Sequence, residues 1–287
     1  MSILTVVQNA LAELSQTVPS SVVGTSANVL ASQMLKHAER TGKSLRDEYE
    51  WPQLVKEYTF TTSNGVAAYS LPADFERFVF MTAWDRANSW ELIGPLSAEE
   101  WQFRKSGITS DPPRKRWRFK GMSTTQFYLD PTPASSDTLV FEYLSKNWIR
   151  PKTWVTSTAF GAASYCFYNG NYYFTSAGGT TGATPPTHTS SSASDGSVTW
   201  VYTLGPYEEA TADTDVCHID ENIITLGAKY RWALAKGVAQ TGVLKEEFEA
   251  TCRRMFPNNV GASKISLNAQ RLARTLYYPR TPESGFG

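Results

Sequence analysis

The sequence has few of the residues that build disulfide frameworks and metal centres. Its 287 residues include only three histidines and three cysteines, Cys166, Cys217 and Cys252. The cysteines form no C-x-x-C pair and their number is odd, which argues against a disulfide framework and against a cysteine-rich zinc site. We therefore expect no metal and no cofactor, in a protein that folds in the cytoplasm.

The sequence also lacks net charge and long apolar runs. Its 27 basic and 27 acidic side chains cancel, so it lacks the overall basic character of proteins that bind nucleic acid non-specifically. Its N-terminal segment has no basic stretch followed by a continuous apolar one, and no segment approaches the roughly 20 apolar residues of a membrane-spanning helix. We expect neither DNA binding as the main activity nor a membrane segment.

Motifs of catalysis are missing as well. The chain has no G-x-S-x-G motif and no phosphate-binding glycine loop. Glu99 and Glu100 precede Trp101 as the acid of a glycosidase could, but adjacent helix positions point in different directions, so we interpret Glu100 as a helix cap with Ser97. Residues 217–221, CHIDE, match no metal-ligand spacing, and their acids suit a helix N-terminus. We expect no catalytic residue.

Both ends of the chain are predicted to be helical. Apolar residues recur at helical spacing from Ile3 to Leu14, and again in a segment that begins near Thr25 or Ser26 and ends before Pro52. A long apolar stripe starts at Ile219 and continues beyond Gly242. We expect these segments to pack together as a helical bundle.

The middle of the chain has the period of strands. Residues 57–72 predict a hairpin around Asn64-Gly65. Five further strand-like runs follow before residue 150, interrupted by one helix over 97–107. The predicted fold class is α+β: terminal helices forming a helical bundle, an antiparallel β body in the middle, and an inserted small all-β module.

The inserted module is predicted over 152–206. Residues 177–202 contain no Lys, Arg or Glu, but aromatic runs surround Asn169-Gly170 and follow Asp195-Gly196, which predicts a small sheet with a floppy loop at about 177–194. The aromatics either form the core of the module or, if exposed, bind a glycan. The candidates for glycan binding are Trp154, Tyr172, Tyr173, Trp200 and Tyr202.

Two groups of segments carry a resemblance. The module, with AGGTTGATPP and SDGSVTWVY after its aromatic hairpin, resembles one that recurs in virion proteins of tailed phages. A helix pair leading into EWPQLVKEYTFTTSNGVAAYSLPADFERF, then a β region, and finally the helix DENIITLGAKYRWALAKG resemble the head-to-tail adaptor, or connector, proteins of short-tailed phages, over about 1–150 and 207–260.

The resemblance implies a structural virion protein at the head-tail junction, synthesised in the host cytoplasm. It would form a ring of identical subunits, expected to number twelve, with the portal protein and the downstream tail proteins, nozzle or fibre, as partners. Genome DNA would pass through the lumen without sequence-specific binding. The alternatives are a carbohydrate-binding virion protein acting through the module and, with less support, a peptidoglycan-cleaving tail enzyme.

The dense basic run PPRKRWRFKG, residues 112–121, has two interpretations. As a strand it places Arg116, Arg118 and Lys120 on one face and Trp117 and Phe119 on the other. The basic face is either an exposed strand face or a band that contacts channel DNA or an acidic neighbouring subunit.

The predicted domains are an adaptor body over 1–151 and 207–256, the module, and an extended C-terminal arm over 257–287. The arm combines apolar anchors with a net basic charge, suited to an acidic groove. In the adaptor family the C-terminal segment docks on the portal; the alternative is a tail packed on its own subunit. The expected portal-binding residues are Leu267, Arg271, Leu272, Arg274, Leu276, Tyr277, Tyr278 and Arg280.

Overall fold

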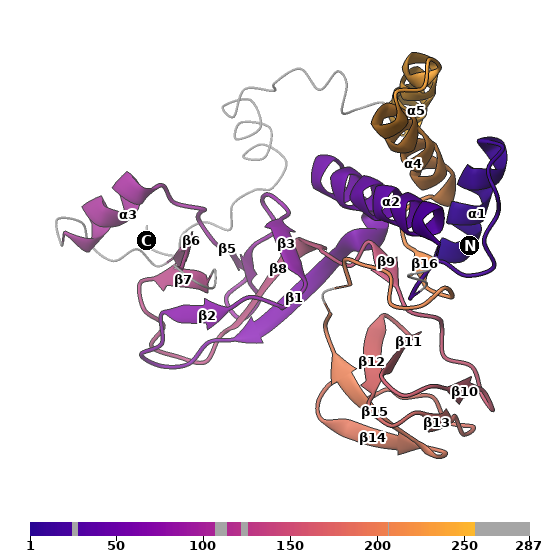
Figure 1. Ribbon diagram of the computed structural model, residues 1–287. Coiled ribbons are helices and arrows are strands. Elements are labelled where there is room, and N and C mark those ends of the chain that lie inside the picture. The colour runs from indigo at the N-terminus through magenta and orange to yellow at the C-terminus, as the bar shows by residue number, and fades with distance from the viewer. Residues whose placement is uncertain (25–27, 107–113, 122–125, 206, 256–287) are drawn as a thin grey trace.

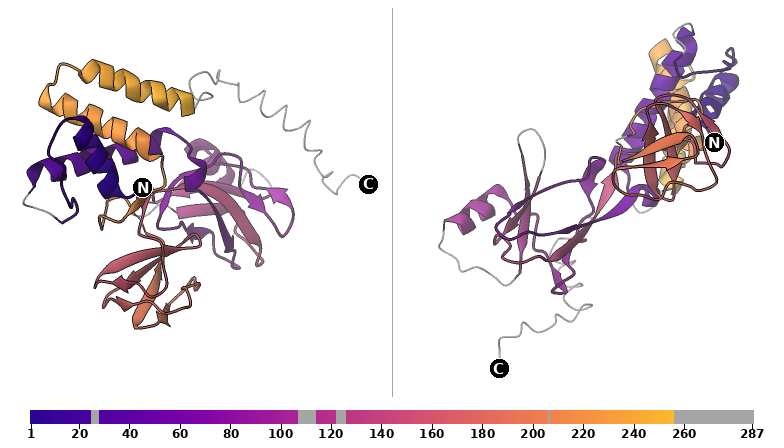
Figure 2. Two further views of the ribbon diagram at one scale, coloured as in Figure 1. Left: turned by 90° about the vertical axis from the view of Figure 1, so that its right-hand side faces the viewer. Right: turned by 90° about the horizontal axis from the view of Figure 1, so that it is seen from below.

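The computed structural model describes residues 1–24, 28–106, 114–121, 126–205 and 207–255, and it confirms the α+β class (Figure 1). Helices α1 (Ile3–Glu13) and α2 (Val29–Glu48) come from one end of the chain. Helices α4 (Glu221–Lys236) and α5 (Thr241–Met255) come from the other end. The four pack together, with α4 in contact with each of the other three (Figures 1 and 2).

Short polar side chains set where these helices begin. Ser2 accepts a hydrogen bond from the Thr5 amide, and Asn28 accepts one from the Ala31 amide. Helix α2 therefore starts after the predicted Thr25 or Ser26, both of which lie outside the described residues. The stripe beyond Ile219 is divided between two helices, because Gly237 ends α4 in the left-handed conformation at φ 65°.

The β body is built from two antiparallel sheets. One orders β1 (Val55–Thr61), β8 (Thr138–Ser145), β4 (Trp84–Asp85) and β5 (Trp90–Glu91), with β3 (Phe75–Phe78) also paired to β8. The other orders β2 (Ala68–Ser70), β7 (Gln126–Asp130) and β6 (Arg116–Lys120). The 3-10 helix η1 (Pro52–Leu54) leads into β1, and α3 (Ala98–Lys105) precedes β6.

Aromatic side chains join the two sheets. The ring centroids of Trp117 and Phe127 lie 4.9 Å apart, and those of Phe127 and Phe141 lie 5.4 Å apart, in stacked geometry. Because Trp117 and Phe127 come from one sheet and Phe141 from the other, this stack forms the centre of the β body.

The predicted hairpin over 57–72 is wrong. A turn does form, with Gly65 at φ 76°, but β1 pairs with β8 and β2 pairs with β7. The turn is thus a corner between the two sheets. Packing favours this corner, because Phe60 of β1 and Tyr69 of β2 enter the same aromatic core with ring centroids 5.0 Å apart.

The module is a small antiparallel unit, as predicted. Its main sheet orders β11 (Ser164–Tyr168), β12 (Asn171–Thr175), β15 (Val198–Thr203) and β14 (Ser192–Asp195), and β10 (Ala159–Phe160) pairs with β13 (Gly179–Thr180). The tight turn at Asn169-Gly170 is confirmed by φ angles of 46° and 83°.

The loop predicted at 177–194 contains β13 and is hydrogen-bonded to the rest of the module. Thr181 is buried and its hydroxyl donates to the carbonyl of Val155 at 2.7 Å. The amide of Gly182 donates to the Asp195 carboxylate, also at 2.7 Å. Hydrogen bonds made by the side chains of Thr181 and Asp195 thus hold this part of the loop in place.

The two crossings between body and module lie side by side. Strand β9 (Ile149–Arg150), before the module, pairs with β16 (Val216–Cys217), after it. The Asn147 amide group donates to the Leu204 carbonyl at 3.0 Å, and the Trp148 indole donates to the Glu208 carbonyl at 3.0 Å. The chain therefore leaves the body and returns to it at one place, as an insertion requires.

Candidate assembly surfaces

The basic face of β6 is packed against helix α3. Arg116, Arg118 and Lys120 share one side of the strand, as predicted, while Trp117 and Phe119 face the aromatic core. The Lys120 ammonium lies 4.3 Å from the ring centroid of the buried Trp101 in α3.

An ion pair fixes α3 over this strand face. Asp130, the cross-strand neighbour of Arg116, accepts from Arg104 Nε at 3.2 Å and also from Lys105. Burial opposes ionisation of Asp130, but these two cations outweigh it and lower its pKa. Burial and then Arg104 lower the pKa of Arg116. Arg116, Arg118 and Lys120 are each half-buried.

Most of the candidate glycan-binding aromatics are buried. Tyr172, Tyr173 and Trp200 present no ring face to solvent, while Trp154 and Tyr202 are half-buried. The indole groups of Trp154 and Trp200 both donate to Asp195, at 2.7 and 3.2 Å. Four of these side chains form the core of the module and Tyr172 packs against the body, which weakens the carbohydrate-binding interpretation.

Tyr172 joins the module to the body. Its ring stacks on Tyr207 with centroids 4.8 Å apart, and the Lys56 ammonium lies 5.0 Å from its centroid. Its hydroxyl lies 3.1 Å from Nε2 of His218. Burial, followed by the nearby charges of Arg150 and Lys56, lowers the pKa of His218 to about 4. Sequence reasoning missed this contact, because no local pattern brings Tyr172 to His218.

A buried carboxylate, Asp74, binds the same Lys56 ammonium that lies over the Tyr172 ring. Asp74 is fully buried and accepts from Tyr143 Oη at 2.8 Å, Ser145 Oγ at 2.7 Å and Lys56 Nζ at 2.8 Å. Burial and then Asp74 raise the pKa of Tyr143, so the phenol stays protonated as a donor. This network holds β1, β8 and the turn before β3 in one arrangement.

A comparison with known families identifies the body. The model of the family described as SU10 adaptor protein matches residues 1–159. The chain belongs to this adaptor family. The match runs from α1 through the β body to the first residues of the module. No curated protein matches the chain.

Membership makes this adaptor a structural, non-enzymatic phage protein. The side chains considered for chemistry have structural partners in the adaptor. Ser97 and Glu100 form the predicted capping box of α3, and Asp220 caps α4 through the amides of Asn222 and Ile223. Cys217 is buried, which raises the pKa of its thiol to about 12.

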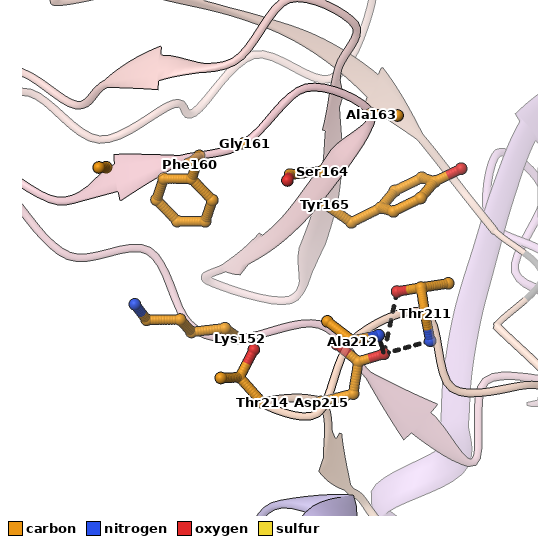
Figure 3. Close-up of a pocket in the computed structure, with 11 residues that line it drawn as sticks. Lys152, Phe160, Gly161, Ala163, Ser164, Tyr165, Thr211, Ala212, Thr214 and Asp215 are labelled. Atoms are coloured by element: carbon orange, nitrogen blue, oxygen red, sulfur yellow. Dashed lines mark hydrogen bonds between the residues drawn. The ribbon is translucent and has the colours of Figure 1, made fainter. Parts of the chain in front are cut away.

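A cleft of about 250 Å³ lies between the module and the 211–215 segment of the adaptor (Figure 3). Asp215 is its one carboxylate, and it accepts from the Thr211 amide, the Thr211 hydroxyl and the Ala212 amide at 2.7 to 3.0 Å. Burial raises the pKa of Asp215 despite these bonds. Its lone pairs are therefore directed into its own loop, and it serves to shape the loop.

Within the described residues, His, Cys, Asp and Glu form no group of three or more that could hold a metal ion. No helix in the same part of the chain is both long and apolar enough to cross a bilayer. The predicted portal-binding residues of the arm, Leu267 to Arg280, lie outside the described residues.

Proposed function

We propose that this adaptor forms the head-to-tail ring of a phage virion, with twelve subunits that join the portal protein to the downstream tail proteins and extend the DNA channel. The observation that carries the proposal is the family match over 1–159, which covers two helices of the bundle and the whole β body. The resemblance of the α4 segment to the same class of protein adds support at the other end of the chain.

The architecture supports a role in transmitting force between two larger assemblies. The bundle, the β body and the module are distinct lobes (Figure 1), and polar networks hold them together. The buried guanidinium of Arg46 in α2 pairs with Glu208 at 2.6 Å, beside the module, and with Glu76 at 3.6 Å, in the β body. Such a network suits a ring subunit, because its lobes must hold one geometry when neighbours pull on them.

We assign the portal contact to the C-terminal arm, 257–287. Four cations of the arm, Lys264, Arg271, Arg274 and Arg280, stand against one carboxylate, Glu283. Leu267, Leu272, Leu276, Tyr277 and Tyr278 supply apolar anchors. A segment of this composition suits an acidic groove on the portal, where its charges guide docking and its apolar side chains become buried.

The decisive experiment mixes purified adaptor with portal rings. We expect light scattering to show a complex that is heavier than the portal ring by the mass of twelve adaptor subunits. Electron microscopy should show a second ring stacked on the portal. A complex in which DNA can enter the stacked ring would support the channel role. Absence of any mass change at micromolar concentrations of both proteins would contradict the proposal, even if the free adaptor stays monomeric.

A further inference from the structure

A cluster of cations lies where α2 meets α4. Arg231 of α4 donates from Nε to the hydroxyl of Thr41 in α2 at 3.2 Å, and that hydroxyl donates to the carbonyl of His37 at 2.8 Å. This places Arg231 over the α2 turn that carries His37 and Arg40. With Lys236, near the end of α4, these residues make up what we call the cationic cluster: His37, Arg40, Arg231 and Lys236.

Arg40 and Arg231 repel each other, and the cations of the cationic cluster disfavour protonation of His37. Burial lowers the pKa of His37, and the charges of Arg231, Arg40 and Lys236 lower it further. Burial and then Arg40 lower the pKa of Arg231. In the part of the chain that the structure describes, no carboxylate forms an ion pair with Arg40, Arg231 or Lys236. The fold therefore bears a local repulsion that an anionic partner would relieve.

The neighbouring lysines limit what that partner can be. Lys36 pairs with Glu39 at 2.7 Å, and Lys43 pairs with Glu209 at 3.3 Å. The free positive charge is thus confined to a small patch and does not continue along α2, as a track for the phosphates of duplex DNA would need. Leu234, one turn beyond Arg231, is 58% exposed. Arginines beside an exposed apolar side chain are typical of a protein interface.

Helix α5 carries a surface of the opposite character. It packs on α4 through Leu244, Phe248 and Cys252, so helical geometry directs Glu246 away from α4. Glu246 and Glu247 are exposed and, within the described residues, neither forms an ion pair, whereas Glu249 pairs with Lys245 and Arg253. Val243, one turn earlier, is 70% exposed. Two free carboxylates thus lie beside an exposed apolar residue, complementing the cationic cluster and Leu234.

The two surfaces occupy different sides of the bundle. The cationic cluster lies between α2 and α4, while helical geometry directs Glu246 outward from α5, away from its contact with α4. Two complementary surfaces at different places on one subunit are what a head-to-tail contact between identical copies uses, and repetition of that contact closes a ring when the rotation allows.

We infer that the cationic cluster and Leu234 of one subunit bind Glu246, Glu247 and Val243 on α5 of the next subunit. This inference rests on the proposed ring and names the surfaces that close it. The charges set the register between copies, and the two apolar side chains lose their exposure to water at the contact.

Charge reversal on the full-length adaptor tests the inference. Arg40 and Lys236 are both exposed, so R40E/K236E leaves the bundle intact, which circular dichroism checks. By sedimentation velocity over a concentration series, or in the portal complex, we expect R40E/K236E and E246K/E247K each to weaken association between copies about tenfold or more. The variant with all four changes restores the opposite charges and should recover association. The control R86E reverses an exposed charge on the β body and should have no effect.

Zero-length cross-linking identifies the contact directly. Carbodiimide joins a lysine amine to a carboxylate that it touches, and an equal mixture of ¹⁴N and ¹⁵N adaptor distinguishes links between copies from links within one. We expect mixed-isotope links from Lys236 to Glu246 or Glu247. Links of this pair only within one chain would overturn the inference, as would duplex DNA binding that R40E/K236E abolishes.

The outcomes separate this inference from the proposed ring. If copies associate, and R40E/K236E associates as tightly as the unaltered chain, the ring stands and these surfaces are wrong. If the unaltered adaptor shows neither association nor mixed-isotope links of any kind, alone or with portal rings, the ring proposal fails and this inference fails with it.

Discussion

Gly42 of α2 lies against the face of a buried indole. A Cβ at this position would come within 2.3 Å of Cε3 of Trp148. Trp148 stands between β8 and β9, is fully buried, and anchors the return of the chain from the module through Glu208. Because Gly42 has no Cβ, the helical bundle can pack closely against the junction of the body and the module.

We predict that Gly42→Ala destabilises the adaptor by about 1–3 kcal/mol, because overpacking against the indole outweighs the better helix propensity of alanine. Urea unfolding followed by circular dichroism measures this change. Gly242→Ala in α5 is the matched control, since a Cβ there meets no atom within 4 Å. That control should alter the free energy of unfolding by less than about 1 kcal/mol. Equal effects of the two substitutions would contradict the packing explanation.

His218 makes stability depend on pH. In the folded chain its pKa is about 4, below the ordinary value of 6.5, so between these values the unfolded chain binds a proton that the folded chain does not. The contribution of His218 to the free energy of unfolding is complete above pH 6.5. It is lost as the pH falls toward 4, by about 3 kcal/mol in all. We predict that His218→Gln flattens the loss of stability from pH 6.5 to 4.5, measured by urea unfolding at each pH. His37→Gln removes a more exposed imidazole and should flatten this loss of stability less. If His218→Gln loses stability between pH 6.5 and 4.5 as steeply as the unaltered chain does, His218 is not the group responsible.

At the scale of elements, the β11–β12 hairpin has two buried faces. Cys166 and Tyr173 face the module core, and their neighbours Phe167 and Tyr172 face the body. Alternation along a strand thus places one set of aromatics inside the module and the next set on its junction with the body. The module is inserted at one place in the chain, yet it shares a core cluster with the body.

This shared packing shapes the expected result of removing the module. We predict that joining Arg150 to Glu208 through a short Gly/Ser linker leaves the helical circular dichroism nearly intact. The free energy of unfolding should fall by about 2 kcal/mol or more, because His218 loses the rings of Phe167 and Tyr172 and the deletion also takes Tyr207 out of the shared core cluster. Within the intact chain, Tyr172→Ala should destabilise the body more than Tyr202→Ala. An unchanged unfolding midpoint would show that the module is fully autonomous, and loss of the helical signal would show that the body cannot fold without it.

At the scale of the whole molecule, the balanced total charge conceals separated surfaces. The 27 basic and 27 acidic side chains cancel in sum, while the cationic cluster and the glutamates of α5 lie on different sides of the bundle. The segment 257–287 is net basic in sequence. Such separation suits a subunit that must bind two kinds of neighbour in fixed orientations.

We predict that the arm is needed for docking on the portal and not for the fold. Truncation after Phe256 should abolish the portal complex while leaving the unfolding midpoint unchanged. Hydrogen exchange should show arm amides that exchange within seconds in the free adaptor and become protected in the complex. R271E/R274E/R280E in the full-length chain tests the charge separately and should weaken docking. Protection of the arm in the isolated adaptor would show instead that it packs on its own subunit.

The sequence alone determined the features that depend on neighbouring residues. The helical stripes, the capping box of Ser97 and Glu100 and the turn at Asn169-Gly170 all formed as expected. Each of them rests on interactions within a few residues, where spacing and backbone preference decide the outcome. The resemblance of the N-terminal half agreed with the family match for the same reason, since it was carried by contiguous segments.

Only the tertiary structure decided which strands pair and which side chains are buried. The turn at Asn64-Gly65 formed, but its two strands joined different sheets, because an aromatic core between the sheets buries more surface than a hairpin standing alone. Tyr172 met Tyr207 and His218, and Arg231 met Thr41, across long separations in sequence. Such contacts depend on how whole elements share a limited interior, and no local spacing of residues encodes that choice.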